Sequence, residues 1–222
     1  MTTPREIYAA YNIMPSLQLH QLRVAAVGKL ICDNFNPPAG GTVNERDVVL
    51  ACLFHDMGNI LKFELAMFPE FTEPEGVDYW ESVKDNYRKK YGDDEHSATQ
   101  EIMREIGLPK GIIDLMEGIG FSKVSEVAES TSFERKIIQY SDLRVGPHGT
   151  LSLNERIQEG RRRYRGSRRS VGTPDENRFN ILVGATRVIE QQLFANASIK
   201  PADINDATVM PLIEELWDYS VS

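Results

Sequence analysis

The sequence predicts an all-α fold. Apolar residues recur at spacings of three and four along most of the chain, the period of an amphipathic helix. One long apolar run, Val48–Phe54, could be a buried strand, but the sequence holds no second strand-like segment to pair with it, so a buried helix is favoured. The chain has 222 residues, 41% of them hydrophobic, with no internal repeat and no clear linker. These features indicate a single helical bundle domain over residues 1–222.

The first two predicted helices flank a turn-rich segment at 34–41. The earlier helix has an apolar face with His20 on it, formed by Leu17, His20, Val24, Val27 and Ile31. Thr42 and Glu45 have capping-box spacing and should open the next helix, which continues into the apolar run.

The middle of the chain predicts a loop followed by a helix with clear ends. The segment Met67–Asp78 contains two prolines and a glycine and has the length of a lid or binding loop. Asp93 is expected to cap a helix that Gly107 ends in a left-handed conformation, with Pro109 blocking continuation.

Four more helices are expected in the C-terminal half. One should span Phe133–Val145, and Ser152 with Glu155 should cap the next. Thr173–Glu176 is a further capping box, with proline at the first helical position, and the last helix should run from near Pro211 to about Trp217.

Composition excludes several classes of protein. The formal charge is 25 − 33 = −8, which argues against broad binding to nucleic acid. The longest apolar run is far short of the ~20 residues that a membrane-spanning helix needs, and the N-terminus does not have the pattern of a signal peptide. The two cysteines, Cys32 and Cys52, lie in apolar segments and are interpreted as reduced core thiols, so we expect a cytoplasmic protein.

Candidate metal ligands occur at three places in predicted helices. His20 alone would be interpreted as a hydrogen-bonded core residue. His55 and Asp56 directly follow the apolar run, where an unpaired carboxylate would be costly to bury. Asp142 lies near the core edge of its helix, where it could also be an internal cap or an arginine partner. Two imidazoles and two carboxylates suit Mn, Fe, Ni, Co or Zn and leave positions open for water and substrate, as a hydrolytic metal requires.

The order His … His-Asp … Asp on an all-helical chain resembles the HD-domain superfamily of metal-dependent phosphohydrolases. HQLRVAAVGKLI is similar to the opening histidine helix, FHDMGN to the central dipeptide in its HDIG-like form, and YSDLRVGP to the segment with the last aspartate. EHSATQEIMREIGLP is like the helix found between these motifs. The resemblance covers about 14–165 and leaves 166–222 as C-terminal helices that pack on the core. It implies one divalent metal, Mg among the candidates, bound by His20, His55, Asp56 and Asp142, with Asp56 also counted among the catalytic residues.

One position departs from the pattern of this superfamily. Some nucleotidases of this superfamily carry glutamate three residues after the aspartate of the dipeptide, and cyclic-dinucleotide phosphodiesterases carry lysine there. This chain has Asn59, which cannot act as an acid or base. Lys62 is expected about one helical turn further on and could bind a phosphate instead, although a solvated surface lysine is an equal alternative.

His96 is the next candidate. Two-metal relatives place further histidines between the dipeptide and the last aspartate, but His96 is the only one in that interval, and His148 follows Asp142 in a Gly/Pro loop. This favours one metal, with His96 binding the substrate phosphate or orienting the attacking water. The alternative is an exposed residue in the first turn of its helix.

Arginines supply the remaining candidate phosphate contacts. Arg23 is three residues after His20, on the same side of the helix, and Arg144 is two after Asp142. Both could bind a phosphate in bidentate fashion, although a structural carboxylate partner is favoured for Arg144. The run Arg161–Arg169 is the one strongly basic segment, and a solvated helix end explains it better than a nucleic-acid site does.

The leading functional hypothesis is a phosphohydrolase that acts on a small phosphate ester, with nucleotides among the candidates. A di-iron oxygenase of the HD type and a non-catalytic metal-binding regulatory domain are the alternatives. We expect a small phosphorylated substrate as the main partner, no membrane partner, and no nucleic acid, and we leave a homo-oligomer open.

Overall fold

The computed structural model describes residues 2–38, 41–166 and 176–221. This part of the chain contains α-helices, short 3-10 helices (η) and two isolated β-bridges, and no strand. The all-α prediction is therefore confirmed. The α-helices are α1 (Pro4–Ala10), α2 (Pro15–Asp33), α3 (Glu45–Phe54), α4 (Val77–Tyr91), α5 (Glu95–Ile106), α6 (Lys110–Met116), α7 (Val124–Glu129), α8 (Phe133–Leu143), α9 (Leu153–Gly166), α10 (Glu176–Phe194) and α11 (Asp206–Leu216). The 3-10 helices are η1 (Asn59–Lys62), η2 (Leu65–Met67), η3 (Pro69–Phe71), η4 (Phe121–Lys123) and η5 (Pro201–Asp203).

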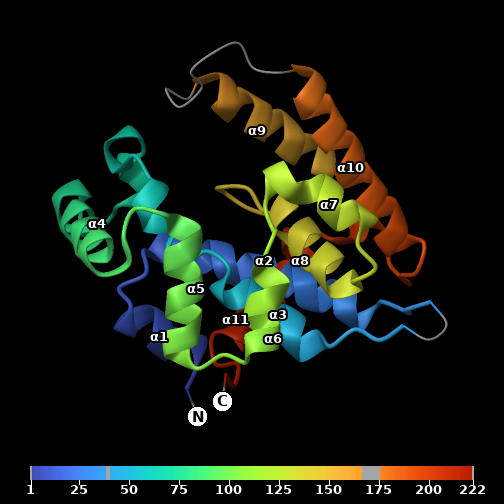
Figure 1. The fold of residues 1–222 in the computed structure, drawn as a ribbon, viewed down its shortest axis with the longest axis horizontal. Helices are drawn as coiled ribbons and strands as arrows, with labels where there is room; N and C mark the ends of the chain where they lie inside the picture. The colour runs from blue at the N-terminus through green and yellow to red at the C-terminus, as the bar shows by residue number, and fades with distance from the viewer. Residues whose placement is uncertain (1, 39–40, 167–175, 222) are drawn as a thin grey trace.

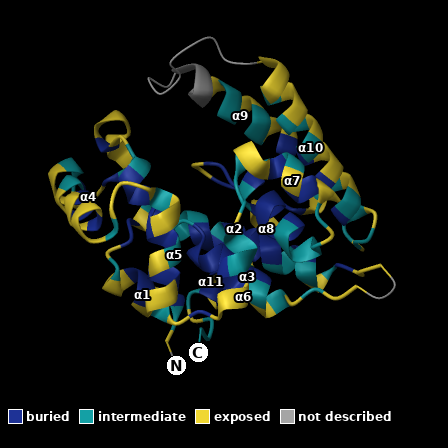
Figure 2. Ribbon diagram, viewed as in Figure 1, coloured by how far each residue is buried: buried dark blue, intermediate teal, exposed yellow. Residues whose placement is uncertain are grey.

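Helices α2, α3 and α8 form the centre of the molecule, where buried residues gather (Figures 1 and 2). Every residue from Val48 to Phe54 is buried, as expected for a central helix. The three helices approach closely at Gly28 of α2. A Cβ atom there would lie 3.2 Å from the Cys52 sulfur of α3 and 3.4 Å from the Ser141 hydroxyl of α8. Glycine at this position therefore allows the three helices to pack together.

The remaining helices surround this centre. The last helix, α11, packs on α2, while α10 packs on α7 and α8. Helices α4 and α5 lie on the other side of the molecule, and α5 contacts η1 directly after the His-Asp dipeptide (Figure 1). None of the described helices combines the length and apolarity needed to cross a bilayer.

Two helix starts differ from the predictions by one or two residues. Asn44, rather than Thr42, caps α3, because its side-chain oxygen accepts a hydrogen bond from Asp47 N at 3.3 Å. Asp94, rather than Asp93, caps α5, because its carboxylate accepts from Ser97 N at 2.7 Å. In both helices the cap is the polar residue directly before the first helical residue, and its side chain accepts a hydrogen bond from a backbone N–H of the first turn.

Two larger differences concern the middle and the end of the chain. The loop expected over Met67–Asp78 contains η3, and its last two residues already belong to α4, a helix that the polar sequence did not reveal. The last helix begins at Asp206 rather than near Pro211, because Asn205 caps it, and Pro211 lies inside it.

Other predicted ends agree with the structure. Gly107 ends α5 with φ +85, and Ser152 and Glu155 exchange the two hydrogen bonds of a capping box. Both cysteines are free, with Cys52 buried. The predicted capping box at Thr173–Glu176 lies almost wholly outside the described residues.

Candidate metal centre

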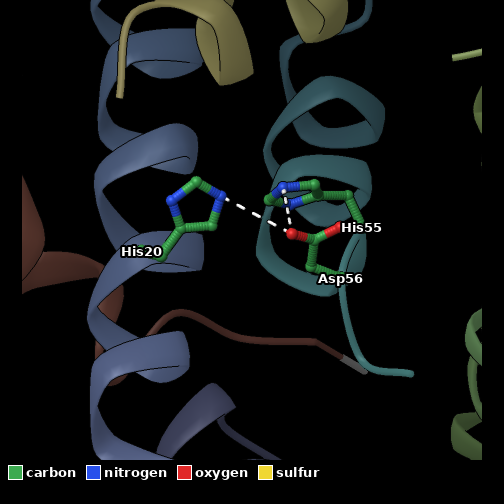
Figure 3. Close-up of side chains that lie close together, drawn as sticks. All are labelled: His20, His55 and Asp56. Atoms are coloured by element: carbon green, nitrogen blue, oxygen red, sulfur yellow. Dashed lines mark ion pairs between the residues drawn. The ribbon is translucent and has the colours of Figure 1, made fainter. Parts of the chain in front are cut away.

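The four predicted ligands come from three helices and lie together. His20 is in the first half of α2, His55 and Asp56 follow the last residue of α3, and Asp142 is the penultimate residue of α8. Figure 3 shows His20 facing the other two residues across the gap between α2 and α3.

The distances among the ring nitrogens and carboxylate oxygens are short. His20 Nε2 is 3.3 Å from Asp142 Oδ1 and 3.6 Å from Asp56 Oδ2. His55 Nε2 is 3.5 Å from Asp56 Oδ2 and 3.6 Å from Asp142 Oδ1. Each carboxylate therefore lies near both imidazoles, and donor atoms of His20, His55 and Asp56 lie within 4.8 Å of one another.

The His55 ring is oriented by the helix that precedes it. Its Nδ1 lies 2.8 Å from the carbonyl oxygen of Cys52, to which it can donate a hydrogen bond. Its Nε2 is buried and has no hydrogen-bond partner among the described residues. A ligating histidine usually donates its other ring N–H to a carbonyl or carboxylate in this way. The unpartnered Nε2 therefore fits a divalent metal ion better than a purely structural role.

The cluster is open on one side. The side chain of His55 is 5% exposed, whereas those of His20, Asp56 and Asp142 are 22%, 21% and 29% exposed. His55 is thus anchored in the core, and the other three reach solvent, from which water and a substrate could approach.

Opposite charges within the cluster shift the pKa values of His55 and Asp142. Burial alone would lower the pKa of His55, but the charge of Asp56 and the contact with Asp142 raise it to about 9. Burial would raise the pKa of Asp142, but the close contact with the His20 and His55 rings and their positive charge hold it well below its usual range. Asp142 is therefore ionised, the form in which a carboxylate binds a metal.

Two further residues position the His-Asp dipeptide and were missed by sequence analysis. Gln21 is fully buried beside His20, and its side-chain oxygen accepts a hydrogen bond from Asp56 N at 3.2 Å. Gly58 lies where a Cβ would come within 2.4 Å of the Glu95 carbonyl oxygen, so only glycine allows the start of α5 to pack there. In the sequence, only its position next to His20 marks Gln21, whereas Gly58 is part of the FHDMGN motif.

Residues 18–142, a little over half of the chain, match the family model of the HD domain. The chain belongs to the HD domain family. This family is all-α, and most members of its superfamily are metal-dependent hydrolases of the phosphohydrolase type. Comparisons with curated proteins and with solved structures found no match.

The expected phosphate-binding residues differ in their surroundings. Arg23 is half-buried, and its Nε is buried without a hydrogen-bond partner in the described ranges. Lys62, at the end of η1, is also half-buried and forms no hydrogen bond or ion pair with a described residue. Neither side chain has an anionic partner among the described residues, so each can bind an anion.

Arg144 does not fit the expected substrate contact. It is 2% exposed, and its guanidinium donates to the Tyr140 hydroxyl and to the carbonyl oxygens of Leu151, Pro201 and Ile204. These bonds use most of its donors, and they tie the loop after α8 to the segment before α11. Arg144 is a structural residue, although its partners are carbonyls rather than the carboxylate that was favoured.

His96 lies in the first turn of α5 with its side chain 71% exposed, and its Nε2 is 4.0 Å from Glu95 Oε1. Its helix begins against Gly58, two residues after Asp56, but His96 is not part of the metal-capable cluster.

The basic run Arg161–Arg169 is only partly described. Arg161 contacts Glu176 and Asn180, and Arg168 and Arg169 lie outside the described residues.

Proposed function

We propose that this HD-domain protein is a phosphohydrolase in which His20, His55, Asp56 and Asp142 hold one divalent metal ion and the substrate is a small phosphate ester. The observation that carries the proposal is that the Nε2 atoms of both imidazoles lie 3.3–3.6 Å from an oxygen of each carboxylate, while the buried Nε2 of His55 forms no hydrogen bond with a described residue. When bound, the metal would neutralise charge on the phosphoryl oxygens and lower the pKa of its water.

The chain's own residues would orient the reaction. Cys52 O and Gln21 fix His55 and the backbone of Asp56, so that the ligands need little rearrangement. Arg23 is on the same side of α2 as His20, and its guanidinium can bind two phosphoryl oxygens at once. Lys62 would supply a second cation, as a point charge.

His96 is proposed to serve the substrate rather than a second metal. Among the described residues, one group of side chains could hold a metal ion, and His96 is not part of this group. An exposed imidazole can donate a proton to a leaving group or orient the attacking water. The expected consequence is that His96→Ala lowers turnover by roughly 10²–10⁴-fold, the usual effect of losing such a group, with metal content still one per chain.

The proposal is tested by metal analysis combined with a panel of phosphate esters. We expect phosphate release that disappears after chelation and returns with Mn, Co, Ni or Mg, and one metal per chain that Asp56→Ala removes. Asp85→Ala, at a carboxylate 60% exposed on α4, is the matched control. Full turnover after confirmed metal loss would refute the proposal.

Adding an oxygen-consumption assay to this experiment separates the alternatives. Oxygen consumption with two iron ions per chain would identify an oxygenase, and metal binding without either activity would identify a regulatory domain. Wild-type protein with two metals, falling to one in His96→Ala, would show that His96 is a ligand.

A further inference from the structure

A pocket of about 450 Å³ lies where α7, α8 and α10 meet (Figure 1). We call it the α7–α10 pocket. Its volume is in the lower part of the range of about 300–1,000 Å³ that is typical of small-molecule sites. Its walls combine aliphatic side chains with two charged side chains and an amide, and none of the four candidate metal ligands is among them. The pocket is therefore a candidate binding site separate from the metal cluster.

The cation of the α7–α10 pocket is Lys136, on α8. The residue is 5% exposed, and its ammonium group forms no hydrogen bond or ion pair with a described residue. Its Nζ lies 5.2 Å from the centre of the Phe133 ring, a contact that is weaker than an ion pair with a carboxylate. Burial lowers the pKa of Lys136, because it disfavours the charged form of the amine. An anion bound in the pocket would offset this cost.

Two hydrogen-bond acceptors line the same pocket. Gln192, on α10, donates from Nε2 to Ala128 O at 3.3 Å, but its Oε1 is buried and has no partner among the described residues. A buried acceptor without a donor is costly, so a ligand with an N–H group would stabilise this site. Glu129, the last residue of α7, is exposed at the pocket and does not pair with Lys136. The pocket thus offers one positive and one negative charge that do not neutralise each other.

Aliphatic side chains form the rest of the wall. Ile181 and Val188 are 66% and 42% exposed, and Ala185 lies between them in the sequence. Ile181 and Val188 are seven residues apart and so share one face of α10. Large aliphatic side chains that are open to solvent beside a pocket favour a ligand with an apolar part.

We propose that the α7–α10 pocket binds an α-amino acid with an aliphatic side chain. The carboxylate of the ligand would pair with Lys136. Its ammonium group would donate to Gln192 Oε1 and lie toward the charge of Glu129. Its side chain would cover Ile181 and Val188. A purely apolar ligand would leave the buried lysine and amide unpaired, which is costly.

Calorimetric titration of the full chain with leucine and two analogues tests this inference without any need for turnover. Leucinamide lacks the carboxylate, and 4-methylpentanoate lacks the ammonium group. We expect the wild type to bind leucine about 10- to 150-fold more tightly than leucinamide, the range for a hydrogen bond to a charged group. Leucine should also bind more tightly than 4-methylpentanoate.

Two variants assign the charged groups of the ligand to their partners. Lys136→Met should lower the affinity for leucine by the same 10- to 150-fold and leave the affinity for leucinamide unchanged. Glu129→Gln should lower the affinity for leucine only about 2- to 5-fold, because Glu129 is exposed, and should leave 4-methylpentanoate binding unchanged. Lys110→Met, at a lysine 86% exposed on α6, is the matched control and should bind leucine as the wild type does.

Ala185→Leu fills the aliphatic part of the pocket and should weaken the binding of all three compounds, which gives a second test should Lys136→Met fail to fold. Three results overturn the inference: no binding of leucine, isoleucine or valine by the wild type, equal affinities for leucine and either analogue, or full leucine affinity in a folded Lys136→Met. None of these results bears on the phosphohydrolase proposal, because the lining of the pocket and the metal cluster share no residue.

Discussion

Replacing Asp142 with asparagine should remove most of the stability that a bound metal adds. Asp142 Oδ1 lies 3.3 Å from His20 Nε2 and 3.6 Å from His55 Nε2, and in the proposed site its carboxylate would supply one of the four ligand positions. The Asp142→Asn variant would keep the shape of the side chain and lose its charge. Removing a residue that only hydrogen-bonds to a metal ligand can lower metal affinity by up to about 100-fold. Because Asp142 would be a ligand itself, we expect metal affinity to fall about 100-fold in Asp142→Asn.

The magnitude follows from mass action. A ligand at about 100 times its dissociation constant stabilises the folded state by ~2.7 kcal/mol, which is a rise in Tm of roughly 5–11 °C for a chain of this size. At the same metal concentration, a 100-fold weaker site adds only about 0.4 kcal/mol, or roughly 1–2 °C.

Thermal melts with and without Mn²⁺, together with metal analysis, measure both quantities. Asp114→Asn, at a carboxylate 43% exposed on α6 and paired with Lys110, is the matched control and should keep the full metal-induced rise. If Asp142→Asn shows the same metal content and the same rise as the wild type, the assignment of Asp142 as a ligand is wrong.

Three further predictions concern the structure around the site. Gly58→Ala should lower the free energy of unfolding by about 1–3 kcal/mol, because its Cβ meets a carbonyl of α5, whereas Gly111→Ala, with open space around it, should not; urea unfolding measures both. Arg144→Met should cost at least about 3 kcal/mol in the same assay, because it leaves several buried acceptors unpaired, while metal content per folded chain stays at the wild-type value. Lys136 is 5% exposed, and burial lowers its pKa, so the unfolded chain holds this proton more tightly and the stability of the fold rises with pH toward the ordinary lysine pKa of 10.5. Lys136→Met should therefore raise Tm at neutral pH, and thermal melts should show this advantage shrinking as the pH approaches about 10; a constant difference would contradict it.

The helices that carry ligands could be predicted from sequence because their signals are local. The apolar period around His20, the apolar run before His55, and the amphipathic segment around Asp142 each mark a helix without reference to the rest of the chain. The order of the motifs then indicated which side chains would meet.

Features that depend on backbone partners elsewhere in the chain could not be predicted. The role of Arg144 depends on carbonyl oxygens of residues up to 60 positions away, and a carbonyl has no signature in the sequence. Helix α4 was missed because its exposed face carries mostly charged residues, and only four of its fifteen residues are buried. The stacked rings of Phe71 and His148, 5.7 Å apart, join two loops, and nothing in either loop's sequence indicates the other.

The close approach of α2, α3 and α8 at Gly28 also has a consequence for the order of events during synthesis of the chain. His20, His55 and Asp56 leave the ribosome early, but Asp142 follows His20 by 122 positions, and its helix must dock at Gly28 before the fourth side chain reaches the others. A growing chain would therefore hold a metal only weakly until α8 has emerged. The amount of metal retained by truncated chains of increasing length would then show at which length α8 packs against α2 and α3. This amount should rise abruptly once residues beyond Leu143 are included.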